Sequence, residues 1–446
     1  MMVGQGLQGR RAAVAGWCLY DWAMSAFNTV IGTFVFSVYF TKGVSADPNQ
    51  GTADWGLMLG LSGLAVAVLS PVLGAIADRG GPAKPWLAAC TAIAVVGSAM
   101  LWFVRPLPDY ALLALVVVGV ASVAFELSYV FYNALLNRVA PPSHIGRVSG
   151  WGWGVGYLGG LGSLILCLVL LIQAEQPLFG LLGTEESQPV RATAVLVAVW
   201  YGLFALPLFL LVPDRAAVPG VPMGQAVAQG LATLWKTLKG LKAYGNVLRY
   251  LVASALWRDG INTITAFGGI FAGVLFGMDQ GQLILFAILL NVAAGLGAIG
   301  FAWLDDLLGS KPTLVVSIVG LFLSGVALLA IGTPWWGWAP VLDLPVGAFT
   351  PEQQWVLVFG LVLGCFFGPA QAAARSMMAR LAPPGMETEF FGLFALTGRA
   401  VGLLGPLAYG LAVEAFDTQR AGMATVLVLF AAGLAILLTV KEPRRG

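Results

Sequence analysis

Long uninterrupted runs of apolar residues alternate with short polar segments along the whole chain. Crossing about 30 Å of hydrocarbon takes roughly 20 helical residues, and most of the runs reach that length. A β-barrel would instead alternate apolar and polar residues over short segments. The runs therefore predict twelve membrane-spanning helices, near residues 14–40, 54–77, 86–104, 109–136, 148–172, 191–212, 247–276, 281–304, 312–332, 353–379, 389–414 and 421–440.

Composition agrees with this pattern. Of the 446 residues, 59% are hydrophobic and only 10% are charged, whereas a soluble domain carries about 25% charged residues. The mean hydropathy is +0.87. These values exclude an ordinary soluble domain and predict an all-α integral membrane protein. Arg10 and Arg11 precede the first apolar run, which has no small-residue cleavage site near its end, so we expect an uncleaved first span.

The polar residues exclude several functional classes. A net charge of +2 does not predict a nucleic-acid partner. The four cysteines fall inside apolar runs and His144 is the single histidine, so we expect no disulfide, no metal site and no cofactor. The sequence holds no phosphate-binding Walker motif, which argues against intrinsic ATP hydrolysis. Dispersed acids and one histidine also argue against a membrane enzyme.

The distribution of Lys and Arg predicts the orientation. Placing both termini in the cytoplasm puts most of the basic loop residues on that side and leaves only Lys42, Arg105, Arg191 and Arg420 on the other. This asymmetry follows the positive-inside rule, and an odd number of spans would scramble it.

The chain divides into two similar halves. Residues 137–160 and 379–402 align without a gap at an offset of 242, which matches two Pro-Pro pairs and the glycines Gly150 with Gly392, and Gly156 with Gly398. We therefore predict two six-helix bundles, residues 1–213 and 247–446, related by pseudo-two-fold symmetry.

A linker at residues 214–246 joins the halves. It begins with a Pro-rich stretch and continues with Val227, Leu231, Leu234, Leu238 and Leu241 at helical spacing. Two interpretations stay open: a helix lying on the inner leaflet, or an amphipathic linker helix without membrane contact.

Matching loops also follow the second span of each half. In "DRGGPAKP" and "DDLLGSKP", Asp78 and Lys84 stand at the same spacing as Asp305 and Lys311. With Arg79, these residues are candidates for contacts that hold one packing of the bundles and break in another. The twelve spans, the repeat and the sequence Gly74–Lys84 resemble the major facilitator superfamily, although that family's two terminal arginines are replaced here.

The first span narrows the resemblance. "YDWAMSAF", which begins at Tyr20, is similar to the first span of the vacuole-effluxer family, except that Met24 stands where an Asn is usual. The resemblance implies transport, and the fungal members' association with amino-acid efflux makes an amino acid the first candidate solute.

Ionisable residues inside the spans are the candidate site, because each needs a partner or a water-filled cavity. Asp21 and Asp259 occupy comparable places in the first span of each half. Ser25 and Asn28 share a helical face with Asp21, and Asn262 follows Asp259. The resemblance implies that these first helices line the central cavity. The acids are thus candidates for substrate contact or proton transfer, or they form structural pairs.

Other spans contribute further candidates. Burial would favour the protonated form of Glu126, which could then load and release a proton. Arg399 is a candidate counter-charge for it or an anchor for a substrate carboxylate. Tyr20, Trp22 and Trp257 lie closest to the acids and are candidate cavity aromatics, whereas we expect the other aromatics to pack. Pro406 is expected to kink its span.

These observations predict a secondary transporter that moves a small polar solute, an amino acid by resemblance, by alternating access with proton coupling. The alternatives are a transporter of peptides, sugars or drug-like solutes, and a membrane sensor or scaffold that transports nothing. We expect a monomer in the lipid bilayer, a multi-pass protein of the bacterial cytoplasmic membrane, that is not an enzyme.

Overall fold

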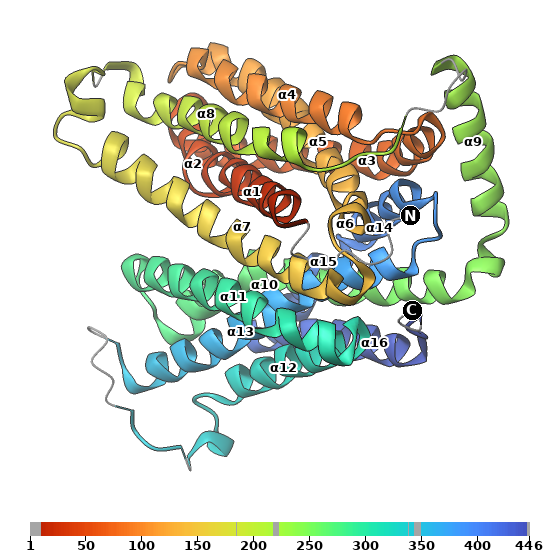
Figure 1. The fold of residues 1–446 in the computed structure, drawn as a ribbon. Coiled ribbons are helices and arrows are strands. Elements are labelled where there is room, and N and C mark those ends of the chain that lie inside the picture. Colours follow the sequence, from red (N-terminus) through yellow and green to blue (C-terminus); the bar gives the residue numbers. More distant parts are fainter. Residues whose placement is uncertain (1–9, 184, 217–222, 338, 343–348, 444–446) are drawn as a thin grey trace. The chain divides into compact units, whose positions relative to one another are not determined.

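The computed structural model describes residues 10–183, 185–216, 223–337, 339–342 and 349–443 (Figure 1). Part of the predicted linker, residues 217–222, lies outside these ranges. Every regular element in the described part of the chain is a helix. The α-helices are α1 (Arg11–Ala26), α2 (Phe36–Tyr39), α3 (Pro48–Gly80), α4 (Lys84–Met100), α5 (Ala111–Ala134), α6 (Leu136–Val139), α7 (Ile145–Cys167), α8 (Gln188–Leu211), α9 (Met223–Lys239), α10 (Gly245–Phe276), α11 (Gln280–Leu308), α12 (Ser310–Ala330), α13 (Pro351–Leu381), α14 (Glu387–Val401), α15 (Leu404–Phe416) and α16 (Gln419–Thr439).

Shorter helical turns extend or connect these elements. Three are π-helical, at Phe27–Phe34, Phe40–Val44 and Leu168–Ile172. The 3-10 turns are Leu101–Phe103, Pro108–Tyr110, Pro142–His144, Pro177–Gly180, Glu185–Ser187, Leu241–Tyr244 and Pro334–Trp336.

Twelve of the described helical segments are long and apolar enough to cross a membrane, and each contains most of one predicted span. The all-α membrane architecture is therefore confirmed. The helices extend several residues beyond the apolar runs: α3, for example, begins at Pro48, where Asp47 accepts a hydrogen bond from the backbone N–H of Gln50 and caps the helix. Apolar runs mark the hydrocarbon crossing, whereas caps and prolines set the helix ends.

Several spans depart from a continuous α-helix, and two of these departures concern predicted residues. Span 1 changes from α-helix to π-helix at Phe27, so the α-helical spacing that placed Asn28 on the face of Asp21 ends two residues before Asn28. Span 11 is interrupted between Val401 and Leu404, which separates α14 from α15. Pro406 therefore lies in the first turn of a new helix, a position where a missing N–H is tolerated.

The chain forms two compact units. Unit 1 comprises residues 1–148, 155–237 and 382–396, and unit 2 comprises residues 149–154, 238–381 and 397–446. The predicted division into 1–213, 214–246 and 247–446 stays a prediction. Within unit 1, α1 packs on α8, α4 packs on α5 and α8, and α3 packs on α5 (Figure 1).

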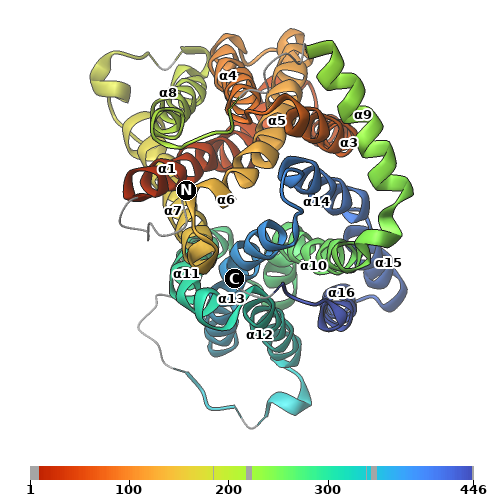
Figure 2. The same cartoon turned by 45° about the vertical axis from the view of Figure 1, so that its right-hand side comes forward.

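Unit 2 repeats the same four pairings. The helix α10 packs on α16, α12 packs on α13 and α16, and α11 packs on α13 (Figure 2). These helices are spans 7 to 10 and 12, so each pair corresponds to the pair of unit 1 six spans earlier. The sequence repeat is thus accompanied by a repeat in helix packing.

The aligned glycines Gly150 and Gly392 have the same role in the two units. In unit 1 a methyl group at Gly392 would overlap the backbone of Ser70 in α3, and in unit 2 one at Gly150 would overlap Ala302 in α11. The hydroxyl of Ser70 also donates to the Gly392 carbonyl, at 3.0 Å. Small residues at these positions allow close helix contact.

The helix α9 lies in the predicted linker. Its Gly230 lies against Ile76 of α3 and Leu234 is buried, whereas Leu231 and Trp235 are 45% and 60% exposed. The interpretation of α9 as a helix on the membrane surface stays a prediction.

Candidate functional site

Asp21 is buried in unit 1, with 4% of its surface exposed. The hydroxyl of Tyr132, on α5, donates to its Oδ2 at 2.8 Å and also lies 3.1 Å from the carbonyl oxygen of Trp17. A hydroxyl has one hydrogen. It can donate to a charged Asp21, or it can donate to Trp17 and accept a hydrogen bond from a protonated Asp21. The Tyr132 hydroxyl can therefore turn between Asp21 and the Trp17 carbonyl.

Tyr20 is fully buried beside this acid. Its hydroxyl shares hydrogen bonds with Thr91 at 2.6 Å and with Tyr201 at 3.1 Å, and its ring stacks on Tyr132 at 5.0 Å. Ser128 lies 3.4 Å from the Tyr201 hydroxyl. The structure thus places Tyr20 in a polar cluster inside unit 1. Sequence reasoning missed its partners, because single hydroxyls in apolar runs carry no signal of which helix they face.

The other polar residues of span 1 lie differently. Ser25 is half-buried and its hydroxyl donates to the Asp21 carbonyl at 2.7 Å, and Asn28 is exposed. Trp22 stacks on Trp200 of α8, with ring centres 5.3 Å apart. In the predicted polar stripe, Ser25 therefore bonds to the backbone of Asp21 rather than to its carboxylate, and Asn28 lies at the surface.

Asp259 is the corresponding acid of unit 2 and is 1% exposed. Its Oδ2 accepts a hydrogen bond from the backbone N–H of Gly405, at 2.7 Å, so it reaches the start of α15. On the same helix, Trp257 is fully buried and Asn262 is exposed. The structure therefore joins Asp259 to span 11, a contact that the sequence did not indicate.

Glu126 and Arg399 lie in different units. Glu126 is half-buried on α5 of unit 1, and Arg399 is exposed in the last turn of α14, in the part that belongs to unit 2. Their roles as proton carrier and anchor stay predictions.

Asp78 lies in the last turn of α3 and caps the start of α14, which belongs to unit 1. It accepts hydrogen bonds from the backbone N–H groups of Thr388 and Glu389 at the start of α14, at 3.3 and 2.8 Å. Arg215 pairs with Asp78 at 3.2 Å and also with Glu387. A carboxylate is favourable there because the N-terminus of a helix carries partial positive charge.

Lys84 begins α4 and takes part in a second cap of unit 1. Asp214, just after α8, accepts from the backbone N–H groups of Ala83 and Lys84 at 3.1 and 2.6 Å. The ammonium of Lys84 donates to the carbonyl of Phe209 at 2.8 Å. Arg79 is exposed. The loop thus ties the start of α4 to the end of α8.

Unit 2 contains the same arrangement, with one addition. Glu442, just after α16, accepts from the backbone N–H groups of Ser310 and Lys311 at 2.9 and 3.1 Å. Arg380 pairs with Glu442 at 2.7 Å and with the buried Asp305 at 3.1 Å. Asp214 and Glu442 were not among the predicted residues, although each is an acid placed directly after the last span of its half.

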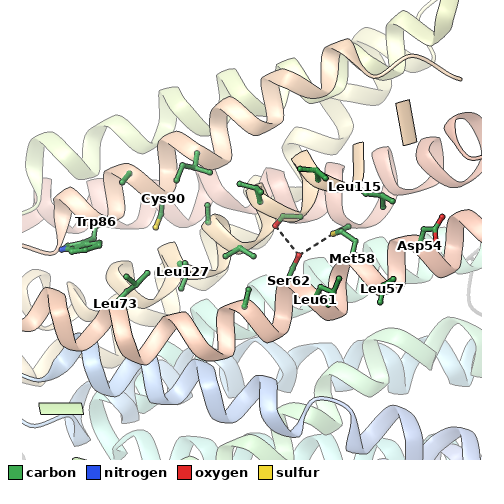
Figure 3. Close-up of a pocket in the computed structure, with 18 residues that line it drawn as sticks. Asp54, Leu57, Met58, Leu61, Ser62, Leu73, Trp86, Cys90, Leu115 and Leu127 are labelled. Atoms are coloured by element: carbon green, nitrogen blue, oxygen red, sulfur yellow. Dashed lines mark hydrogen bonds between the residues drawn. The ribbon is translucent and has the colours of Figure 1, made fainter. Parts of the chain in front are cut away.

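An apolar groove of about 690 Å³ lies between α3, α4 and α5 of unit 1 (Figure 3). Leu57, Met58, Cys90 and Leu127 are among its lining residues. The hydroxyl of Ser62 is directed to the Gly119 carbonyl at 3.3 Å and to the Met58 sulfur at 3.7 Å. This lining suits hydrocarbon rather than a polar solute, so we do not assign the solute to it.

Solved structures share the architecture. The proton:xylose symporter XylE bound to 6-bromo-6-deoxy-D-glucose matches with a TM-score of 0.73 at 12% identity, over 98% of this chain and 97% of that chain. An outward-facing bacterial homologue of the iron transporter ferroportin matches with a TM-score of 0.66 at 13% identity, over 96% and 98%. At these identities the likeness shows the fold.

Sequence comparisons are more specific. An uncharacterized MFS-type transporter of Bacillus subtilis, YxiO, is 28% identical over 433 residues, which cover 96% of this chain and 94% of that protein. Autophagy-related protein 22-1 of Neosartorya fischeri is 25% identical over 310 residues, which cover 67% of this chain and 48% of that protein. The match thus spans about half the length of this fungal relative.

Two family profiles match the sequence. The profile of the Major Facilitator Superfamily matches residues 5–163. The profile described as "Vacuole effluxer Atg22 like" matches residues 142–445, more than half of the chain. The protein is therefore a major facilitator superfamily transporter that belongs to the Atg22-like vacuole effluxer family.

Proposed function

We propose that this transporter moves a small polar solute, with an amino acid as the first candidate, by alternating access driven by a proton gradient. The observation that carries the proposal is a buried carboxylate on the first span of each unit, Asp21 and Asp259. A charged group inside a membrane span is costly and marks an ion or substrate pathway.

The solute class rests on charge. An amino acid presents an ammonium and a carboxylate, so its recognition needs at least one acid and one base. Asp21 with Ser25 and Asn28, and Asp259 with Asn262, supply the acidic side of the proposed pathway. In this proposal Arg399 supplies a base, Glu126 is a further proton carrier, and the aromatics Tyr20, Trp22 and Trp257 would line the pathway.

The moving parts of the proposal are the two bundles, residues 1–213 and 247–446, joined by a cytoplasmic linker at 214–246. The loop residues Asp78, Arg79 and Lys84 of the first bundle, and Asp305 and Lys311 of the second, would hold one state and release it in another. Support comes from the helix caps at Asp78 and at the start of α4 and α12. We place the protein as a monomer in a bacterial cytoplasmic membrane, with both termini in the cytoplasm.

Uptake into proteoliposomes tests this function. Labelled amino acids, a dipeptide and a sugar are offered with and without an imposed pH gradient. We expect one amino acid to accumulate only with the gradient, and Asp21→Asn to abolish accumulation. The matched control is Asp109→Asn, which changes an exposed acid in the 3-10 turn Pro108–Tyr110 that precedes α5. Equal uptake with and without the gradient would refute proton coupling.

The other outcomes identify the alternatives. Accumulation of only the sugar or only the dipeptide would show that the solute belongs to that class and is not an amino acid. Thermal stabilisation by a solute that never crosses the membrane would favour a sensor. Loss of uptake in Asp109→Asn as well would show that the two substitutions act through folding.

A further inference from the structure

Span 11 is interrupted in the second half of the chain, between α14 and α15. The backbone N–H of Gly402 donates to the carbonyl of Arg399, three residues earlier, at 3.4 Å. This spacing is that of a tight turn rather than of an α-helix. Four residues after Gly402 stands Pro406, which has no N–H to donate to the Gly402 carbonyl. The chain thus has an irregular turn within an apolar segment, and such turns are tolerated only where other groups satisfy the backbone.

Two adjacent residues of α10 lie at the two sides of this turn. The carboxylate of Asp259 accepts the N–H of Gly405, in the first turn of α15. The guanidinium of Arg258 lies against Gly398 in the last turn of α14, where an added methyl group would be 3.1 Å from Nη1. A helix is partially positive at its start and negative at its end. Each side chain therefore places the complementary charge at its helix end.

The fit around Asp259 is close. The hydroxyl of Thr263 donates to the Asp259 carbonyl at 2.8 Å, and a methyl group at Gly405 would overlap that hydroxyl. Glycine at position 405 is thus required for α15 to approach the carboxylate. The start of α15 is held by a contact that a small displacement of this helix would break.

The second carboxylate oxygen of Asp259 has no such contact. Asp259 is 1% exposed, and within the described part of the chain its Oδ1 has no hydrogen-bond partner. Buried polar atoms are nearly always paired, because an unpaired one keeps the cost of leaving water. A single proton bound to Oδ1 would remove the charge that causes this cost.

Charged side chains also stand on α10 itself and on the helices of unit 2 that contact it. They are Arg258 on α10, Asp305 on α11, Arg375 on α13, Arg399 on α14, Glu414 on α15 and Arg420 on α16. Arg375 donates to Ser149, Arg420 donates to carbonyls at the end of α12, and Arg380 pairs with Asp305. Among the described residues none of them forms an ion pair with Asp259, so its charge is balanced chiefly by the start of α15.

We propose that Oδ1 of Asp259 is the proton-binding site of unit 2 and that proton binding frees the start of α15 from α10. A proton from water adds to the carboxylate, which becomes a neutral acid. A neutral acid is a weaker acceptor for the Gly405 N–H than a carboxylate, since charge-assisted hydrogen bonds are about twice as strong. The inference rests on the proposed proton-coupled transport, for which it names the residue and the moving helix.

Hydrogen exchange of the full-length protein in detergent tests this step without a known solute. We expect the segment 402–416 to exchange about five-fold faster at low pH than at high pH, after correction for the intrinsic rate, because one charge-assisted bond is weakened. Asp259→Asn should exchange fast at every pH. Asp21→Asn, the matched change in unit 1, should keep the pH dependence of wild type.

Two further measurements separate the possible outcomes. Gly405→Ala should give fast exchange at every pH, because the added methyl displaces α15 while Asp259 remains. Hydrogen exchange of residues 402–416 at one pH should be equal in sodium chloride and in choline chloride. Slower exchange in sodium chloride alone would show that Oδ1 of Asp259 binds a metal cation rather than a proton. A pH-independent wild type, or an unchanged pH dependence in Asp259→Asn, would overturn the inference. Intact pH dependence in a protein that moves no solute would instead refute only the proposed transport.

Discussion

Two carboxylates cap corresponding helices in the two units, and removing each should destabilise its own unit. Asp214 accepts the N–H groups of Ala83 and Lys84 in unit 1, and Glu442 accepts those of Ser310 and Lys311 in unit 2. The first N–H groups of a helix have no partner within the helix. Asp214→Ala and Glu442→Ala each leave two of them without their acceptor.

The two losses should differ in size. Removal of an N-terminal cap costs about 0.5–2 kcal/mol of stability, so we expect about 1.5 kcal/mol for Asp214→Ala. Glu442 accepts in addition from Arg380, a side chain that is 7% exposed and that keeps Asp305 as its second partner. A hydrogen bond to a charged group contributes about 1.5–3 kcal/mol when buried. We expect Glu442→Ala to cost about 3 kcal/mol, which is about twice the loss at Asp214.

The cysteines allow each unit to be followed separately. Cys167 is buried in unit 1, and Cys365 lies in unit 2. Two backgrounds, each keeping one of these thiols, are heated in detergent with a thiol-reactive fluorogenic dye. Glu442→Ala should lower the temperature at which Cys365 reacts and leave that of Cys167 unchanged, and Asp214→Ala should do the reverse. The controls Glu442→Gln and Asp214→Asn keep one acceptor oxygen and should give smaller shifts.

The reasoning fails if both thiols shift together with either substitution, because each cap would then stabilise the whole molecule rather than its own unit. It also fails if neither thiol shifts, because the capping bonds would then contribute nothing. A larger shift for Asp214→Ala than for Glu442→Ala would refute the assigned role of Arg380.

Three further substitutions test other contacts. Gly392→Val should destabilise unit 1 and Gly150→Val unit 2, each by about 1–3 kcal/mol, because both insert bulk into a close helix contact; the single-thiol assay would measure this. Tyr132→Phe should cost about 1–3 kcal/mol, because it removes a hydroxyl that donates to the buried Asp21, and a lowered midpoint of Cys167 labelling would report it. Asp78→Asn should speed hydrogen exchange of residues 387–396 several-fold, because the start of α14 loses a charged acceptor; unchanged exchange would contradict the cap.

The sequence was sufficient for the architecture because few physical requirements determine it. The thickness of hydrocarbon sets the length of a span, and twelve apolar runs of that length predicted the twelve observed segments. The alignment at an offset of 242 also paired Gly150 with Gly392, which make equivalent helix contacts. Glycine spacing carries this information because only a small residue permits such an approach.

The partners of the candidate residues could not be predicted, because they depend on which helix faces which. Tyr132 and Tyr201 are ordinary aromatic residues in apolar runs, and only packing brings Tyr132 to Asp21. The interruption of span 11 was indicated by Pro406 only as a kink. Its support by Asp259, and the caps at Asp214 and Glu442, follow from the packing of spans that are distant in sequence.

The acids of the two units are held by different kinds of donor, and this difference assigns them different tasks within the proposed cycle. The hydroxyl of Tyr132 can turn from Asp21 to the Trp17 carbonyl while the backbone stays in place. The N–H of Gly405 belongs to the backbone and cannot turn, so its release from Asp259 requires that α15 itself move. The proposal therefore ties protonation of Asp259 to helix motion and makes no such demand on Asp21. Flux should accordingly be sensitive to both Asp21→Asn and Asp259→Asn, but only Asp259→Asn should change the exchange of residues 402–416. A change of the same size in Asp21→Asn would show that α15 responds to the charge of the whole molecule rather than to the carboxylate that caps it.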